Sequence, residues 1–449
     1  MSFGHFEYVI GEYSIMENFF KLKERGTTVG KEVIAGITTF LAMAYILAVN
    51  PGILSASGMD FGSVFTATAV ASAIATLVMA FAANLPVALA PGMGLNAFFT
   101  YTVVLGMGCS WQFALTAVLL EGILFIILSL VGVREAIIKS IPASLRKAVA
   151  VGIGLFITLI GLANAGIVSS ETGTIIGFVN LNLQNSAALV AVLGLIITII
   201  LYVLKVPGSV LIGIAITTII GIPFGVTSVP ENFKAVSLPA APYFFEFEWS
   251  NVLTMKFFIV FFTFLFTDMF DTIGTLMGVT EQAGLTDKNG DIPNAKGALF
   301  ADAVGTVVGS IFGTSTVTSF VESSAGVASG GRTGLSSVVT SIFFLLALFL
   351  SPLFALVPSA ATAPALIFVG FLMIKSVAGI DFSDVTEGIP AFITIMVMPF
   401  SYSIAKGISW GIIAYVICKV AGKKAKDIPV VTWILAAIFL FDIIFEAVK

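Results

Sequence analysis

Long apolar stretches recur along the chain and constrain its fold more than any other feature. A helix of about 20 residues crosses a hydrocarbon core of roughly 30 Å. Only 10% of the 449 residues are charged, against about 25% in soluble domains. The sequence therefore predicts an all-α polytopic membrane protein. Its simple spans lie at about 33–50, 64–83, 112–131, 144–163, 187–204, 209–222, 257–277, 297–312, 336–351, 361–376, 388–402 and 407–421.

The residue inventory excludes several classes of function. The net charge is −4, which leaves no basic surface for nucleic acid. Cys109 and Cys418 lack metal-ligand spacing, and His5 is the sole histidine. A zinc site, a Ser-His-Asp triad and a Cys-His dyad are therefore not expected, and we predict neither a cofactor nor a metal.

Two further segments, 87–104 and 314–329, are too broken for plain helices. The first contains two prolines and two glycines within 84–94. We expect extended backbone over Val87–Leu89 and a half-helix from Leu95, then extended backbone over 312–316 and a half-helix from Val317. Non-helical backbone at membrane depth is tolerated inside protein or beside a cavity. The two breaks therefore predict a midplane site between them.

The two broken segments bring the total to fourteen crossing segments, seven on each side of the loop at 223–256. Thr39–Leu41 matches Thr263–Leu265 at an offset of 263 − 39 = 224. Asn96 corresponds to Glu322 at 322 − 96 = 226. An odd number of crossings per half inverts the second copy, so we expect a 7+7 inverted repeat.

The positions of the basic residues predict a cytoplasmic N-terminus. On this layout three basic residues lie outside, namely Lys234, Lys256 and Lys406. The apolar stretch 429–448 is either a fifteenth span or a helix on the membrane surface, and Asp442 and Glu446 on one face favour the surface. The 17 inside basic residues are Lys21, Lys23, Arg25, Lys31, Arg134, Lys139, Arg146, Lys147, Lys205, Lys288, Lys296, Arg332, Lys375, Lys419, Lys423, Lys424 and Lys426.

Acidic residues inside apolar segments mark candidate ion or proton pathways. Asp268 and Asp271 are three residues apart and share a helical face. The spans hold no deep Lys or Arg, which favours a neutral, planar, hydrogen-bonding solute over a dianion, and uphill movement of such a solute requires a coupled ion. The acids are Glu121, Asp268, Asp271, Asp302, Glu322 and Asp442.

The sequence around each candidate residue indicates whether its role is functional or structural. Glu322 lies near Ser319 in a polar stretch and is a strong site candidate. Asp302 is either functional or a helix-packing hydrogen bonder, and Glu121 is interpreted as structural. Asn96 suits hydrogen bonding to a planar ligand, whereas Phe98 suits either stacking on it or ordinary packing.

Several long motifs match a known family. They are TTFLAMAYI at 38–46, APGMGLNAFF at 90–99, DMFDTIGT at 268–275, GTSTVTSFVES at 313–323 and MPFSYSI at 398–404. From about Phe19 to Lys419 the chain resembles the AzgA-like branch of the nucleobase–ascorbate (xanthine/uracil permease) superfamily. The stretch before Met16 departs from the family pattern.

The resemblance implies fold, function and site. It implies import of purines such as adenine, guanine or hypoxanthine by proton symport across the inner membrane, with Asn96, Asp268 and Glu322 binding the base and Asp271 serving translocation. We add Phe98 and Ser319 as substrate contacts, and Glu322 and Asp302 as proton-coupling candidates. The implied layout is an N-terminal segment 1–32, a core domain at 33–131 and 257–351, a gate domain at 144–222 and 361–421, and a tail helix at 422–449.

Alternatives stay open at this point. The preferred purine, sodium in place of the proton, and a homodimer are undecided. An anion carrier or channel of the same fold is disfavoured by the missing deep cations. An intramembrane aspartyl protease needs a Gly-x-Gly-Asp context that the chain lacks.

Overall fold

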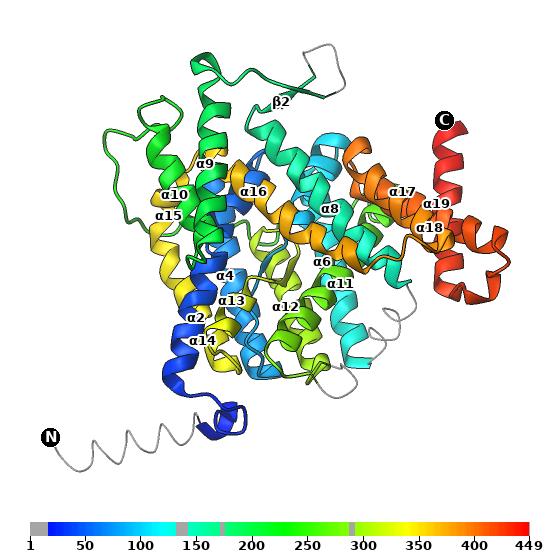
Figure 1. Cartoon of the computed structure of the whole chain (residues 1–449), viewed down its shortest axis with the longest axis horizontal. Coiled ribbons are helices and arrows are strands. Elements are labelled where there is room, and N and C mark those ends of the chain that lie inside the picture. Colours follow the sequence, from blue (N-terminus) through cyan, green and yellow to red (C-terminus); the bar gives the residue numbers. More distant parts are fainter. Residues whose placement is uncertain (1–16, 132–141, 171–175, 287–291, 449) are drawn as a thin grey trace.

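The computed structural model describes residues 17–131, 142–170, 176–286 and 292–448, and these are mostly helical (Figure 1). The α-helices are α2 (Val29–Met43), α3 (Ile46–Ser55), α4 (Phe61–Val78), α5 (Met93–Ala97), α6 (Trp111–Val131), α8 (Ala143–Asn164), α9 (Ser186–Val203), α10 (Ser209–Gly221), α11 (Met255–Gln282), α12 (Ala295–Phe312), α13 (Ser323–Ala328), α14 (Gly334–Ala347), α15 (Ser351–Ala355), α16 (Ser359–Ile374), α17 (Val385–Ser401), α18 (Ile404–Ala421) and α19 (Val430–Val448).

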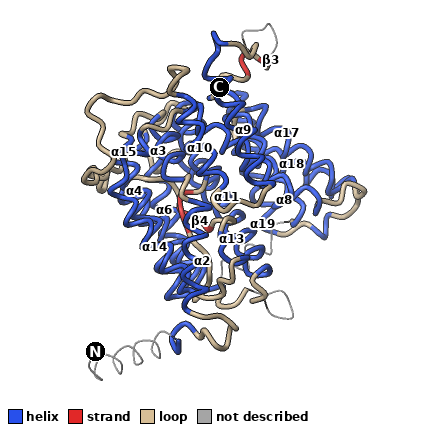
Figure 2. The backbone as a smooth tube through the Cα atoms, turned by 60° about the vertical axis from the view of Figure 1, so that its left-hand side comes forward, coloured by secondary structure: helices blue, strands red, loops and turns tan. Residues whose placement is uncertain are grey.

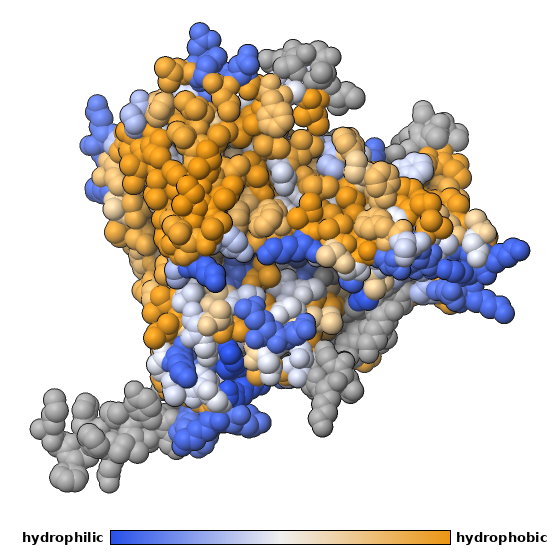
Figure 3. Space-filling model, in the orientation of Figure 1, coloured by the Kyte–Doolittle hydropathy of each residue, from blue (hydrophilic) through white to orange (hydrophobic). Residues whose placement is uncertain are grey.

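The helices confirm a polytopic membrane protein. Among the described residues, 10 helical stretches are long and apolar enough to span a bilayer, and the four shorter apolar helices include Ser209–Gly221 and Val385–Ser401. The surface over α9 and α10 is broadly apolar (Figure 3), with Ile200 and Ile219 exposed on it. Such a surface is suited to lipid rather than water.

The helices pack in two groups. In the first, α12 packs on α4 and α6, while α14 packs on α2 and α4. In the second, α16 packs on α8, α9 and α10, while α17 packs on α8 and α18. Helix α11 contacts α6 and α13 of the first group and α8 and α18 of the second. It therefore runs along the boundary where a site between the groups is expected.

Two short strands lie in the middle of the helices (Figure 2). Strand β1 (Leu89–Pro91) pairs antiparallel with β4 (Val317–Ser319), and Ala90 faces Thr318 at the centre of the pair. Thr76 of α4 bonds both the N–H and the C=O of Leu89, and Thr306 of α12 donates to the Val317 carbonyl. These bonds satisfy strand-edge groups that a membrane interior would leave unpaired. A second short strand pair, β2 (Val168–Ser169) and β3 (Gly177–Phe178), lies in a loop.

The broken segments differ in detail from the sequence prediction. The second half-helix was expected from Val317, but this residue begins β4, and α13 begins at Ser323. Thr316, Val317 and Thr318 are β-branched and favour extended backbone. The first strand starts at Leu89 rather than Val87, and α5 continues as the π-helix Phe98–Gly106.

The first span is also interrupted. Its two helices, α2 and α3, are separated by Ala44 and Tyr45. The tail helix α19 packs on α18, and the side chains of Asp442 and Glu446 lie outside the described residues. The N-terminal residues 1–15 likewise lie outside the described part of the chain.

Candidate functional site

The chain around β4 is anchored by side chains from several segments. Ser315 donates to Asn96 Oδ1, and Thr316 donates to Glu121 Oε2 at 2.9 Å. Thr314 accepts from Asn50 Nδ2 at 2.8 Å. These bonds hold the backbone of the second broken segment against the core helices, so residues 317–322 have a fixed position.

A cavity lies where the two helix groups meet. Polar residues of α11 and of the segments beside the first group line it together with Gly92, namely Asp271, Tyr45, Ser319 and Glu322. Apolar side chains from the second group close the other side, namely Ile153, Val369 and Met373. The charged lining is acidic, since no Lys, Arg or His is among the lining residues of the described chain. We call Tyr45, Asp271, Ser319 and Glu322 the cavity cluster.

A second cavity adjoins the first. The two share Ile153, Thr267, Asp271, Thr275, Val321, Val369 and Met373 in their linings. The second continues past Gly274 to Leu372 and Ser376, at the end of α16. The two cavities together form a path from the cavity cluster toward that end of the molecule.

Glu322 is held by a residue of the first span. Tyr45 Oη donates to Glu322 Oε1 at 2.5 Å. Tyr45 reaches this position because it stands at the break between α2 and α3, whereas Glu322 stands at the N-cap of α13. Helices α2 and α13 pack closely at Gly326, where an added Cβ would collide with Thr39. The pair therefore has a short and well-defined separation.

The cavity face of α11 follows a simple spacing. Thr267, Asp271 and Thr275 are four residues apart and all line the cavity. Four residues of an α-helix return to nearly the same direction and advance about 6 Å. These three residues therefore form one polar stripe along the cavity.

The neighbouring face of α11 points into the protein. Thr272 Oγ1 lies 2.5 Å from Asp302 Oδ1, 3.3 Å from Asp268 Oδ1 and 2.7 Å from Thr318 Oγ1. Asp268 and Asp302 are fully buried, and neither is among the described residues that line the cavity. We call Asp268, Thr272, Asp302 and Thr318 the buried cluster.

Two other predicted contacts also lie behind the cavity wall. Asn96 is fully buried and bonded to Ser315, although its neighbours Gly94 and Leu95 line the cavity. Phe98 packs edge-on against Phe264, with ring centroids 4.8 Å apart. The structure thus brings Asp271, Ser319 and Glu322 together and leaves Asn96, Phe98, Asp268 and Asp302 outside the lining.

Sequence reasoning missed Tyr45 and Thr267. Thr267 could have been predicted, because it lies four residues, about one helical turn, before Asp271. Tyr45 carried no such signal, since its place depends on an unpredicted helix break between Met43 and Ile46.

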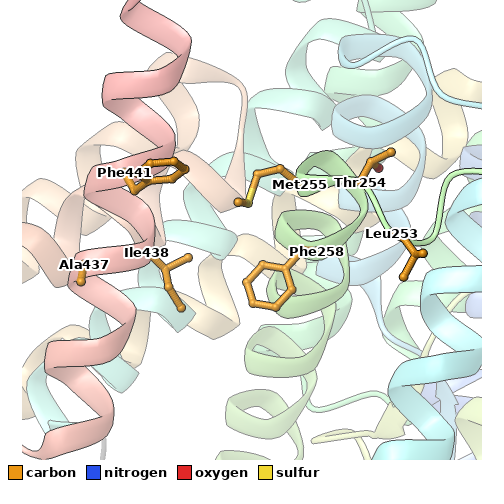
Figure 4. A pocket seen from close by; sticks show the side chains of 7 residues that line it. All are labelled: Leu253, Thr254, Met255, Phe258, Ala437, Ile438 and Phe441. Carbon is orange, nitrogen blue, oxygen red and sulfur yellow. The ribbon is translucent and has the colours of Figure 1, made fainter.

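A larger hollow lies elsewhere, between α11 and α19 (Figure 4). Thr254 is the one polar residue in its lining, which otherwise consists of Leu253, Met255, Phe258, Ala437, Ile438 and Phe441. Among the described residues its lining includes none of the candidate acids, so it does not offer the chemistry expected of the site.

Comparison with known sequences gives a family. The sequence profile described as "Permease family", of the xanthine/uracil type, matches residues 30–410. A putative permease of Methanocaldococcus jannaschii is 48% identical, over 96% of this chain and 98% of its own. The guanine/hypoxanthine permease PbuG of Bacillus subtilis is 45% identical over 96% and 100%. The adenine permease AdeQ of Escherichia coli is 43% identical over 98% of each.

Comparison with solved structures gives the fold. The transmembrane domain of the cyanobacterial bicarbonate transporter BicA superposes with a TM-score of 0.63. It covers 84% of this chain and 97% of that domain, at 19% identity. At this identity the likeness concerns the architecture alone.

Proposed function

Because the chain belongs to the permease family of the xanthine–uracil superfamily, we propose that it imports purine nucleobases by secondary active transport. The observation that carries this proposal is the acidic cavity between the two helix groups. A purine base is planar and mostly neutral at pH 7. Its N–H groups donate hydrogen bonds that carboxylates accept. The permeases of adenine and of guanine/hypoxanthine among its relatives support this substrate class.

We propose that Glu322, Asp271 and Ser319 contact the base directly. Each lines the cavity, and Glu322 already accepts one hydrogen bond from Tyr45. Asn96, Asp268 and Asp302 then act one layer behind, by fixing the broken segments and α11. Phe98 acts through packing against Phe264.

The coupling ion is proposed to be the proton. A carboxylate enclosed in a membrane protein without a cationic partner is costly to keep ionised and readily takes up a proton. One proton crossing about 100 mV supplies roughly 2.3 kcal/mol. Glu322 or Asp271 accepts the proton from outside, and its protonated carboxyl group donates a hydrogen bond to an acceptor of the base, while the other carboxylate accepts an N–H group. Loss of the proton inside removes the donated bond, which weakens binding and releases the base.

Alternating access is proposed to move the two helix groups against each other. They correspond to the expected core (33–131 and 257–351) and gate (144–222 and 361–421) domains. The antiparallel pairing of β1 with β4, and the matching bonds from Thr76 and Thr306, support a 7+7 inverted repeat. With a cytoplasmic N-terminus, the path toward Ser376 opens inward.

Uptake into proteoliposomes tests the proposal. Radiolabelled adenine, guanine and hypoxanthine are offered with and without an inward proton gradient. We expect at least one base to accumulate with the gradient and a protonophore to abolish this accumulation. Accumulation driven by sodium alone would overturn the coupling. Bicarbonate or sulfate flux without purine competition would overturn the substrate class.

A further inference from the structure

Two buried hydroxyls face the cavity without a bonding partner. Thr267 Oγ1 and Ser319 Oγ have no hydrogen-bond partner among the described residues. Thr267 is 1% exposed and Ser319 is 2% exposed, and both line the cavity. Buried polar atoms in folded proteins are nearly always hydrogen-bonded. Their partner is therefore expected to come from whatever fills the cavity.

Three other hydroxyls on the same helix have hydrogen-bond partners within the protein. Thr263 donates to the Ile259 carbonyl at 2.8 Å, and Thr280 donates to the Leu276 carbonyl at 2.6 Å. Thr272 belongs to the buried cluster. Thr267 differs from these three residues because its hydroxyl has no partner within the described protein and the residue lines the cavity.

The unpartnered hydroxyls accompany the two cavity acids. Thr267 precedes Asp271 by four residues on α11. Ser319 is the last residue of β4 and precedes Glu322 by three residues. Each of the two polar segments in the cavity lining thus presents one carboxylate and one hydroxyl without a partner among the described residues. An ionised carboxylate only accepts hydrogen bonds, whereas a hydroxyl rotates to donate or accept.

We propose that Thr267 is a substrate-contacting residue whose hydroxyl, with that of Ser319, bonds either a carbonyl or an amino group of the base. This inference rests on the proposed function and deepens it. A 6-oxo purine offers an acceptor where a 6-amino purine offers donors. Because a hydroxyl can donate to the carbonyl group or accept from the amino group, the site admits both classes of purine.

Equilibrium binding of radiolabelled hypoxanthine and adenine to the purified protein tests this. Thr267→Val keeps the side-chain shape and removes the hydroxyl, whereas Thr267→Ser keeps the hydroxyl. Thr263→Val is the matched control on the same helix. We expect Thr267→Val to weaken Kd for both bases by about 5- to 10-fold, the effect of one hydrogen bond. Thr267→Ser and Thr263→Val should stay within about twofold of wild type.

Ser319→Ala provides an independent variant if Thr267→Val fails to fold, and a loss of about the same size is expected for both bases. Wild-type affinity in the folded hydroxyl-deletion variants would overturn the inference, as would an equal loss in Thr263→Val. Loss for one base alone would overturn the claim that both classes use this hydroxyl. If the wild-type protein binds neither base, the proposed function itself fails.

Discussion

Each of the two acid clusters includes one acid of α11, Asp268 or Asp271, and the surroundings of these two acids differ. The cavity cluster contains Asp271 and Glu322, which face open space and, across it, apolar side chains of the second helix group. The buried cluster contains Asp268 and Asp302, which share the hydroxyl of Thr272. The same residue type therefore lines a cavity on one face of the helix and accepts internal hydrogen bonds on the next.

This difference has a chemical consequence. One hydroxyl has a single proton, so Thr272 donates to only one acceptor at a time. Its two acids and Thr318 surround this hydroxyl inside the protein, whereas the cavity acids border the space that a ligand can enter. Substitutions in the cavity cluster should therefore change transport, and substitutions in the buried cluster should first change stability.

Glu322→Gln gives the largest expected effect. The variant loses a charged acceptor for the base and a candidate proton carrier, so uptake should fall by about 10- to 100-fold, and its pH dependence should flatten. Initial uptake rates between pH 5.5 and 8 in proteoliposomes measure this.

Glu121→Gln is the matched control for this variant, because Glu121 is a fully buried acid bonded to Thr316 rather than to the cavity. Its uptake should stay near wild type, because the amide oxygen of Gln still accepts the hydrogen bond from Thr316. If Glu322→Gln transports normally, or if both variants lose activity equally, the cavity cluster is not the binding site.

Asp271→Asn is expected to give the second-largest effect. Replacing a cavity acid by its amide removes a charge-assisted bond, so uptake should fall about tenfold while the melting temperature in detergent stays within a few degrees of wild type. Paired uptake and thermal unfolding measurements separate the two effects. An unchanged rate with a lowered melting temperature would assign Asp271 to the buried cluster instead.

Asp302→Ala is expected to lower stability and leave binding unchanged, which is the opposite of the pattern for Asp271→Asn. It removes a fully buried acceptor 2.5 Å from Thr272, which should cost about 1–3 kcal/mol of stability. The Kd for the base in the protein that remains folded should be near wild type. Thermal unfolding and binding on the same sample check this, and a lost affinity without a stability change would contradict the division.

Lys424→Ala, outside both clusters, gives the smallest effect. Lys424 Nζ lies 2.7 Å from Asp384 Oδ2 at an exposed position, and bonds from Lys424 and Thr386 hold the pKa of Asp384 well below its usual range. A lowered pKa stabilises the fold above the unfolded value near 4 and loses this effect only as the pH falls further. Exposed ion pairs contribute little to stability, so the melting curves of the variant and the wild type should nearly coincide from pH 6 to 8, and any small difference should disappear as the pH falls below the unfolded value.

The sequence predicted the broad architecture because apolar length and motif content determine it. It also placed the extended pieces near both breaks and named Glu322 and Asp271, which line the cavity in the structure. Their contacts were harder to predict. Asp268 and Asp271 share a broad helical face by spacing, but a turn of about 60° between them separates buried from open surroundings.

Other details depend on tertiary packing that one sequence does not encode locally. The β-branched run at 316–318 favoured β4 over the expected helix start at Val317. The sequence left Phe98 equally suited to stacking on a ligand and to packing within the protein. In the structure its ring packs against Phe264. Tyr45 joined the site because α2 ends at Met43, two residues before it.

The most direct test of the central claim is a structure of the protein with a brominated purine base bound. The bromine signal locates the base independently of any mutation. The account predicts the base in the cavity, within hydrogen-bond distance of Glu322 and near Asp271 and Thr267. A base bound in the apolar hollow between α11 and α19, or elsewhere away from Glu322, would contradict it.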